Sequence, residues 1–215
     1  MLGGFAPIGK RLICKIASFM RHLLYNKPMK KTIFLTMGGT IDAEAYEQTP
    51  VDVTPLAQSL IPSTLRTLGI ADNAYEIIPV CSLDSKQVTP NHLKSAIAVM
   101  AERDDVDQFI ITHGTDTMPD HARLFQSLME KWNIDPSAKV IFTGAMKPLS
   151  NGPETDGWGN LRTSMEKMPE LAPGVHIVMH GTVLPIEGAR KDLDNARIWV
   201  DKTAKDLMPV TPLQK

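Results

Sequence analysis

Residues 109–118, FIITHGTDTM, combine an apolar run with a cluster of side chains that can do chemistry. The first three residues are apolar and predict a strand buried on both faces, as in a parallel sheet covered by helices. Residues 112–117 then supply three hydroxyls, an imidazole and a carboxylate. Because ligands bind at the carboxyl ends of strands in open α/β sheets, this segment is the first candidate for a functional site.

Four predicted strands end in a glycine followed by a small residue. The four segments are TMGGT at 36–40, THGT at 112–115, FTGA at 142–145 and MHGT at 179–182. A tight turn explains any one of them. In a parallel sheet all four ends lie on the same edge, so together they favour a shared site.

Phosphate and metal binding fit these residues poorly. The glycines lack the Lys-Ser/Thr of a P-loop, and G-x-G-x-x-G does not occur. His113 and His180 close strands, and Asp42 and Asp116 are further potential ligands. However, H-x-x-H and H-E-x-x-H spacings do not occur, and a histidine that ends a strand is more often a hydrogen-bonded structural residue. We therefore expect neither a metal site nor a cofactor.

Nucleophilic catalysis by threonine fits the residue types better. A threonine hydroxyl is a weak nucleophile at neutral pH and needs a neighbouring base, which can be a lysine whose ammonium form is disfavoured by burial. Thr40, Thr115, Asp116 and a late lysine such as Lys191 supply these types. Spacing along the chain does not say whether they meet.

Apolar runs and helical patterns alternate along the chain from residue 32 onward. Strands are predicted at 32–37, 75–80, 108–113, 139–144 and 175–180. Helices are predicted at 90–103, 119–132, 54–68 and 159–168. This alternation predicts an α/β domain with right-handed crossovers, a mostly parallel sheet and a flavodoxin-like three-layer arrangement.

Several local signals refine the helices. Thr89 is a good N-cap with Pro90 at the first helical position, and Pro62 is expected to break or kink the helix at 54–68. The helix at 119–132 is expected to bury a stripe of Leu124, Leu128 and Met129. The histidines of the predicted helices, His92 and His121, are expected to be solvated surface residues.

Composition indicates one main globular domain: of 215 residues, 43% are hydrophobic and 22% are charged. The net charge of -1 gives no indication of a nucleic-acid partner. No apolar run reaches the ~18 residues of a membrane span. Two isolated cysteines, Cys14 and Cys81, favour a reducing compartment such as the cytoplasm.

The N-terminal segment is strongly basic. Seven basic residues precede the first acidic one, Asp42, and residues 10–24 predict a basic amphipathic helix. Its recurring charges argue against a secretory signal. It is either a helix that binds an anionic membrane or a partner, or a leader that the fold ignores. We favour the leader, because KKTIFLT after Met29 resembles the normal start of a domain, so residues 1–28 are expected to be dispensable.

A series of motifs resembles the bacterial-type L-asparaginase family. The motifs are TMGGTID at 36–42, DSKQVTP at 84–90, ITHGTDTM at 111–118, FTGAMKP at 142–148 and RK at 190–191. They occur in the family's order, and HGTDTM together with GGTI is highly specific. The overall length is similar to short asparaginase-like proteins that contain only the larger N-terminal domain. The resemblance implies that domain at 29–203, between the extension at 1–28 and a tail at 204–215.

The resemblance also implies roles for individual residues. Thr40 matches the primary nucleophile, and a second catalytic group corresponds to Thr115, Asp116 and Lys191. Ser85 matches the serine that binds the substrate's α-carboxylate. Asp116 would also face the α-ammonium, which orients an amino acid for attack. Backbone N–H groups near two glycines, Gly39 and Gly114, would stabilise the oxyanion.

Three features depart from the family pattern. Lys86 stands where full-length enzymes often carry a glutamine or serine that touches the amino acid. Tyr46 lies in the loop after GGTI and is the candidate for the family's catalytic tyrosine, although the loop's spacing differs. The second domain, which in full-length relatives completes a neighbouring subunit's site, is not expected here.

The resemblance therefore implies hydrolysis of the side-chain amide of L-asparagine or a similar small amide through an acyl-threonine intermediate. Two alternatives remain: a catalytically weak or inactive module that binds an amino acid, and an amidohydrolase that acts on a larger amide. We expect a homodimer or larger homo-oligomer, because a partner would wall the pocket. No nucleic-acid partner is expected, and membrane contact through the N-terminal helix is disfavoured.

Overall fold

The computed structural model of the chain describes residues 31–46, 54–192 and 197–200. They belong to one compact unit that begins at Lys31. The predicted amphipathic helix at 10–24 and the predicted tail at 204–215 lie outside these residues. Within the part of the chain that is described, no helix is both long and apolar enough to cross a membrane.

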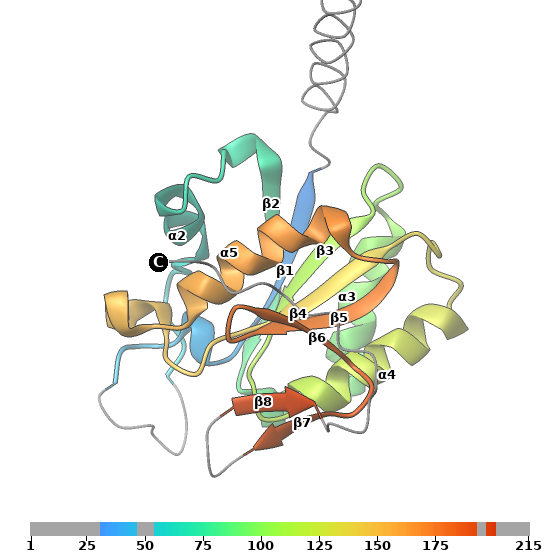
Figure 1. Cartoon of the computed structure of the whole chain (residues 1–215). Coiled ribbons are helices and arrows are strands. Elements are labelled where there is room, and N and C mark those ends of the chain that lie inside the picture. The colour runs from blue at the N-terminus through green and yellow to red at the C-terminus, as the bar shows by residue number, and fades with distance from the viewer. Residues whose placement is uncertain (1–30, 47–53, 193–196, 201–215) are drawn as a thin grey trace, which may run out of the picture. The chain divides into compact units, whose positions relative to one another are not determined.

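Eight strands and four α-helices make up the described domain (Figure 1). The strands are β1 Thr32–Gly38, β2 Tyr75–Leu83, β3 Gln108–Thr112, β4 Lys139–Thr143, β5 Gly174–Met179, β6 Thr182–Pro185, β7 Ala189–Asp192 and β8 Arg197–Val200. The helices are α2 Ile61–Thr67, α3 Pro90–Ala101, α4 Met118–Lys131 and α5 Gly157–Lys167. Short 3-10 helices are η1 Thr40–Asp42, η2 Asp72–Ala74, η3 Ser85–Gln87, η4 Leu149–Glu154 and η5 Met168–Glu170.

The main sheet has six strands in the order β2-β1-β3-β4-β5-β6. The first five are parallel, and β6 runs antiparallel to β5. All five predicted strands are present, which confirms the α/β prediction of a mostly parallel sheet. The order β2-β1-β3-β4-β5 is that of flavodoxin-like domains.

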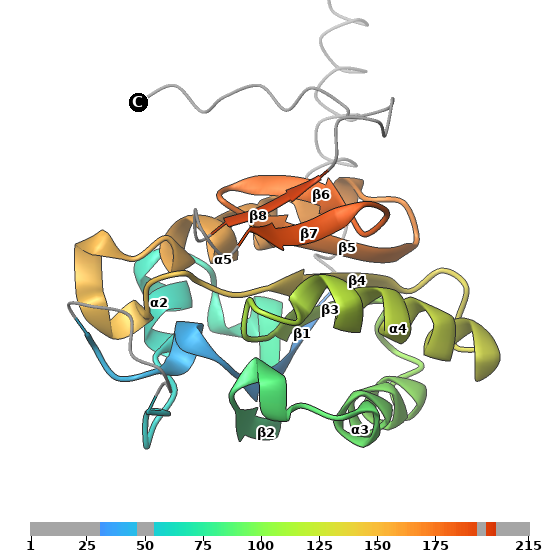
Figure 2. The same cartoon turned by 90° about the horizontal axis from the view of Figure 1, so that it is seen from below.

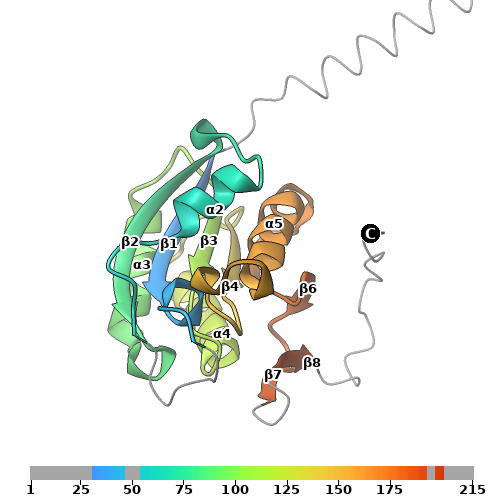
Figure 3. The ribbon, with the colours of Figure 1, turned by 90° about the vertical axis from the view of Figure 1, so that its left-hand side faces the viewer.

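Helices cover both faces of the sheet, so the domain has three layers (Figure 3). Alternate residues of each strand point to opposite faces: in β1, Ile33 and Leu35 join the core under α3 and α4, whereas Phe34 joins the core under α2 and α5. In β3, Ile111 and Ile110 divide in the same way. Burial on both faces explains why these strands are apolar without alternation.

The strand β6 was not predicted from the sequence. His180 and Gly181 both have positive φ, at 55° and 65°, which is the geometry of a two-residue hairpin turn. The Met179–Thr182 pair closes this turn between β5 and β6. The fourth glycine segment, MHGT, is therefore a hairpin turn and not a strand-to-helix turn like the other three.

The two-stranded β7-β8 hairpin was also not predicted. It is antiparallel and pairs Lys191 with Ile198 (Figure 2). Its strands have four residues each, and the sequence of β7 is ARKD. So short and charged a segment carries no alternating apolar signal.

Two helix predictions need correction. Residues 54–60 are not helical, and Pro62 lies in the first turn of α2 rather than within a longer helix, since proline is tolerated at that position. In α4 the predicted Met129 is buried, but Leu124 and Leu128 are only partly buried, and the fully buried side chains include Ala122 and Phe125.

The histidines of these helices are not simply solvated. His92 forms a capping box with Thr89, because its Nδ1 accepts a hydrogen bond from the Thr89 N–H at 3.0 Å. His121 is half-buried, and its Nδ1 lies 3.0 Å from His113 Nε2. The prediction of a surface residue is therefore wrong for His121, whereas His92 lies at the surface and also caps α3.

Candidate active site

The carboxyl ends of β1 and β3 meet at the point where the strand order reverses. In α/β sheets of this kind ligands bind at such a reversal. Gly39 follows β1 with φ of 81°, and a Cβ on it would collide with the backbone of Gly114, which follows β3. The two turns can approach this closely because Gly39 has no Cβ, whereas the missing Cβ of Gly114 leaves room for Ser85. Their chain neighbours, Thr40 and Thr115, are thereby brought to the same place.

Ser85 lies beside this pair of turns. It begins η3 and is 1% exposed, and a Cβ on Gly114 would lie 2.7 Å from the Ser85 Cβ. Thr117 Oγ1 donates a hydrogen bond of 2.9 Å to the Ser85 carbonyl. The turn after β3 and η3 are therefore fastened together, and Ser85 is part of the site.

The Gly39 N–H donates a 2.9 Å hydrogen bond to the Leu83 carbonyl. The Gly39 N–H itself is therefore directed at β2 and not at the site, whereas the oxyanion role of the neighbouring backbone N–H groups stays a prediction. Gly39 serves the site through its close approach to Gly114, and Gly114 remains the candidate for stabilising an oxyanion.

Tyr46 lies beside Thr40, although the loop between them differs in spacing from the family pattern. Burial raises the pKa of the Tyr46 hydroxyl, and a hydrogen bond with the Thr40 side chain acts in the opposite direction. The Tyr46 hydroxyl also donates to the Met146 carbonyl at 3.1 Å. Asn151 Nδ2 donates to the Tyr46 carbonyl at 2.8 Å, which holds this part of the loop. Tyr46 therefore lies near Thr40, with its own hydroxyl hydrogen directed at Met146.

Lys191 and Thr115, 76 positions apart in the sequence, are hydrogen-bonded. Lys191 Nζ lies 2.7 Å from Thr115 Oγ1 and 3.1 Å from Met146 Sδ. Only 11% of the lysine side chain is exposed, so burial lowers its pKa while the charge of Asp116 raises it. A lysine with a lowered pKa has a larger neutral fraction, which can accept a proton.

The strand that carries Lys191 is held by neighbouring elements. Arg123 of α4 donates hydrogen bonds from Nη1 to the Ile186 carbonyl at 3.0 Å and the Ala189 carbonyl at 2.9 Å. Opposite Lys191, the Ile198 N–H donates to His180 Nε2 at 3.2 Å. Burial lowers the pKa of His180, which favours the neutral ring that can accept this bond.

Two lysine side chains approach the Asp116 carboxylate. Lys86 Nζ lies 3.0 Å from Asp116 Oδ2, and Lys191 Nζ lies 3.7 Å from Oδ1. The Asp116 side chain is 31% exposed and that of Lys86 is 66% exposed. The structure thus brings together Thr115, Asp116 and Lys191 and adds Lys86 to them.

A pair of histidines supports the turn after β3. His113 is fully buried, and its Nδ1 lies 2.7 Å from the Gly114 carbonyl, which can only accept. His113 Nδ1 therefore carries the proton, Nε2 accepts, and His121 Nδ1 donates to it. Burial lowers the pKa of His113 to about 4. A neutral His113 thus fixes Gly114 beside Thr115.

Two polar residues that sequence reasoning missed shape the turn after β4. Asp156 accepts hydrogen bonds from the backbone N–H groups of Met146 at 2.8 Å and Lys147 at 3.0 Å. Asn160, which is fully buried, donates to the Gly144 carbonyl at 2.9 Å. Their i, i+4 spacing at the start of α5 places both side chains on one helix face, and that spacing is the signal that identifies them.

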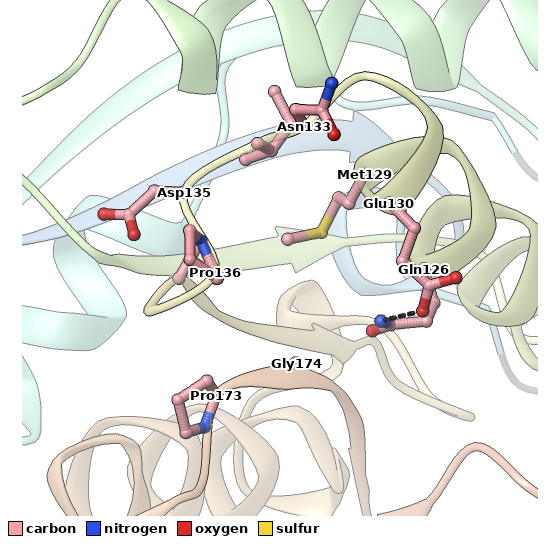
Figure 4. Close-up of a pocket in the computed structure, with 10 residues that line it drawn as sticks. Gln126, Met129, Glu130, Asn133, Asp135, Pro136, Pro173 and Gly174 are labelled. Atoms are coloured by element: carbon pink, nitrogen blue, oxygen red, sulfur yellow. Dashed lines mark hydrogen bonds between the residues drawn. The ribbon is translucent and has the colours of Figure 1, made fainter.

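A separate pocket of about 430 Å³ lies away from these residues (Figure 4). Its lining includes Met129 and Glu130 near the end of α4, and Ala138 and Gly174 at the starts of β4 and β5. In the close-up, Gln126 Nε2 donates to Glu130 Oε1 at 2.7 Å. These are the amino ends of parallel strands, so this pocket lies at the edge opposite the candidate site.

Comparison with known proteins agrees with this geometry. Residues 31–197 match the family model described as asparaginase, N-terminal. L-asparaginase 1 of Escherichia coli K12 is 32% identical over 141 residues, which cover 63% of this chain and 40% of that protein. A subunit of the glutamyl-tRNA(Gln) amidotransferase of Methanococcus vannielii is 27% identical over 165 residues, covering 75% of this chain and 37% of that protein.

A solved structure shows the same fold. The thermostable L-asparaginase from Thermococcus kodakarensis superposes with a TM-score of 0.60 at 24% identity, covering 75% of this chain and 47% of that one. The chain thus spans less than half the length of each of these three relatives. Since the family model covers most of the described domain, the chain belongs to the asparaginase family and corresponds to its N-terminal domain.

Proposed function

We propose that this chain is an amidohydrolase that converts the side-chain amide of L-asparagine or a similar small amide into the acid and ammonia. The observation that carries the proposal is the 2.7 Å contact between Lys191 Nζ and Thr115 Oγ1, made by a lysine that is 11% exposed. A buried amine against a hydroxyl is an arrangement that activates a nucleophile. The Lys191–Thr115 contact lies near Thr40, at the carboxyl ends of the strands, where sheets of this kind bind ligands.

In this proposal Thr40 is the nucleophile. Its Oγ1 attacks the amide carbon as its proton passes through Thr115 to the neutral Lys191 amine. The tetrahedral intermediate then collapses, the C–N bond breaks, and the leaving nitrogen takes up that proton and departs as ammonia. A water molecule next attacks the acyl-threonine ester, which releases the acid and restores Thr40.

The second group completes proton transfer and orients the substrate. Neutral Lys191 accepts a proton through Thr115, and the Gly114 N–H stabilises the oxyanion. Ser85 binds the carboxylate at the other end of the substrate. Asp116 stands where the resemblance to the family directs the substrate's α-ammonium, although two lysines already contact it.

Relatives suggest the reaction class but not the substrate. Of the matched proteins, one is called L-asparaginase 1 and another is a subunit of an amidotransferase. A module that binds an amino acid without turnover, and a hydrolase of larger amides, are the alternatives. Ammonia release from a panel of amides separates all three, because only the binding module releases none.

The decisive experiment compares Thr40→Ala with the full chain. We expect amide hydrolysis to fall by about a thousandfold or more, because removal of a covalent nucleophile eliminates the acyl intermediate. Thr40 lies in a 3-10 turn and is only partly buried, so the circular dichroism spectrum should not change. Thr67→Ala, at an exposed threonine of α2, is the matched control. Normal turnover by folded Thr40→Ala would remove Thr40 from the mechanism.

A further inference from the structure

Lys86 pairs with Asp116, the carboxylate that would bind the α-ammonium of an amino-acid substrate. Its Nζ lies 3.0 Å from Asp116 Oδ2, while Lys191 Nζ lies 3.7 Å from the other oxygen. The negative charge of Asp116 is therefore already paired with the Lys86 ammonium. An incoming α-ammonium would have to displace Lys86 or share the carboxylate with it.

The turn that carries Lys86 is fixed in place. Asp84 caps η3 by accepting a hydrogen bond from the Lys86 N–H at 2.8 Å. Thr117 Oγ1 donates to the Ser85 carbonyl at 2.9 Å, which ties η3 to the segment that contains Asp116. The Lys86–Asp116 ion pair thus spans two segments that are fastened to each other, so the backbone positions of both residues follow from the local fold.

The charge of Lys86 also acts on the rest of the site. Burial is the main reason for the lowered pKa of Lys191, and the positive charge of Lys86 contributes in the same direction. Lys86 is the neighbour of Ser85, the candidate ligand of the substrate's carboxylate. At this position an ammonium attracts a substrate carboxylate and repels a substrate ammonium.

We propose that Lys86 takes the place of the substrate's α-ammonium at Asp116, so that the site prefers monoamides of short dicarboxylic acids that carry no ammonium next to the carboxylate. This inference rests on the proposed amide hydrolysis. The reaction is unchanged: water adds to the carbonyl carbon, the C–N bond breaks, and the products are the dicarboxylate and ammonia. Succinamate is the member of this class with the carbon chain of L-asparagine, from which it differs only by the missing α-ammonium.

Binding of the two products tests the preference independently of turnover. We expect the full chain to bind succinate about tenfold more tightly than L-aspartate in calorimetry, because like charges a few ångströms apart repel even near a protein surface. Added salt should weaken the preference, since Lys86 is largely exposed. Equal affinities, tighter binding of L-aspartate, or no binding of either acid would overturn the inference.

The variant Lys86→Gln tests whether Lys86 causes the preference for succinate over L-aspartate. It should bring the succinate to L-aspartate affinity ratio close to one, whereas Lys167→Gln should leave it unchanged, because Lys167 makes a similar ion pair with Glu170 on α5 and η5. A ratio that is unaffected by Lys86→Gln refutes the role of Lys86.

Turnover of succinamate and L-asparagine separates the two proposals. Hydrolysis of L-asparagine in preference to succinamate would leave the amidohydrolase proposal standing and refute the preference. Selective binding of succinate without hydrolysis of any amide would support the preference and refute the amidohydrolase proposal.

Discussion

Lys191 holds its amine in surroundings that disfavour a full positive charge. The side chain is 11% exposed and contacts a hydroxyl and a thioether, with the Asp116 carboxylate 3.7 Å away. Burial therefore lowers the pKa of Lys191, and Asp116 limits the shift. The balance leaves an amine that is able both to hold Thr115 and to accept its proton.

Replacing Lys191 by methionine should keep the fold and strongly lower the rate of amide hydrolysis. Methionine retains an apolar stem of similar length but has no amine, so we expect activity to fall by about 10²–10⁴-fold, as on the loss of a general base. Arg190→Met, at the exposed neighbour on the same strand, is the matched control and should retain activity. Amide hydrolysis should be measured alongside thermal unfolding, and full activity of folded Lys191→Met would refute the role.

The residue types of the site can be predicted from the sequence, but their contacts cannot. Motifs singled out Thr115 and Lys191, yet the 76 positions between them say nothing about a hydrogen bond. The Lys86–Asp116 ion pair depends on the position of η3 beside the turn after β3. It is a property of two segments brought together by the sheet.

Three elements meet around the histidine pair behind the site. His113 follows β3, His121 lies near the start of α4, and Thr117 links both to η3. With His121 Nδ1 as the donor, the bond between the rings requires a neutral His113, because a protonated His113 would present an N–H and force His121 to change tautomer. Protonation would therefore loosen the contact among these elements.

We expect this contact to make the stability of the domain depend on pH. The pKa of His113 is about 4 in the folded chain and about 6.5 when unfolded. Between these values the unfolded chain binds the additional proton, so the contribution is complete above about pH 6.5 and is lost as the pH falls toward about 4. The loss amounts to about 3 kcal/mol. Urea unfolding across this range should show it, and His113→Gln should reduce the slope.

The nuclear magnetic resonance signal of the His113 ring gives a check on the full chain that does not depend on a variant. Its titration midpoint should lie near pH 4. A midpoint near about 6.5, the value of an unperturbed imidazole, would show that the ring charges without cost, and the network would then not hold the elements together.

Among the strands and helices, apolar content decides which elements can be predicted from the sequence. The strands β1, β3, β4 and β5 are dominated by buried residues, and their positions follow from composition alone. The strand β6 is only partly buried, and β7 is polar, so neither has a period-two pattern to read. The position of His121 was missed for a related reason: helical periodicity marks an apolar face but not a polar contact beside it.

At the scale of the whole molecule, the candidate site is partly exposed to water. The Asp116 side chain is 31% exposed, and water at a catalytic carboxylate screens the contacts that orient a substrate. In the relatives described above, more than half of the protein lies outside the matched region. Additional protein surface over the strand ends would improve these contacts.

We expect a second copy of the chain to provide that surface, because two-fold dimers are the commonest assembly and each copy offers the same open edge. Specific activity should then fall on dilution, in parallel with the mass measured by light scattering. Thr67→Ala provides the control, since its exposed side chain on α2 bonds only within its own helix and its dilution curve should match that of the full chain. A strictly monomeric chain whose specific activity is constant over the series would show that a single copy builds a complete site.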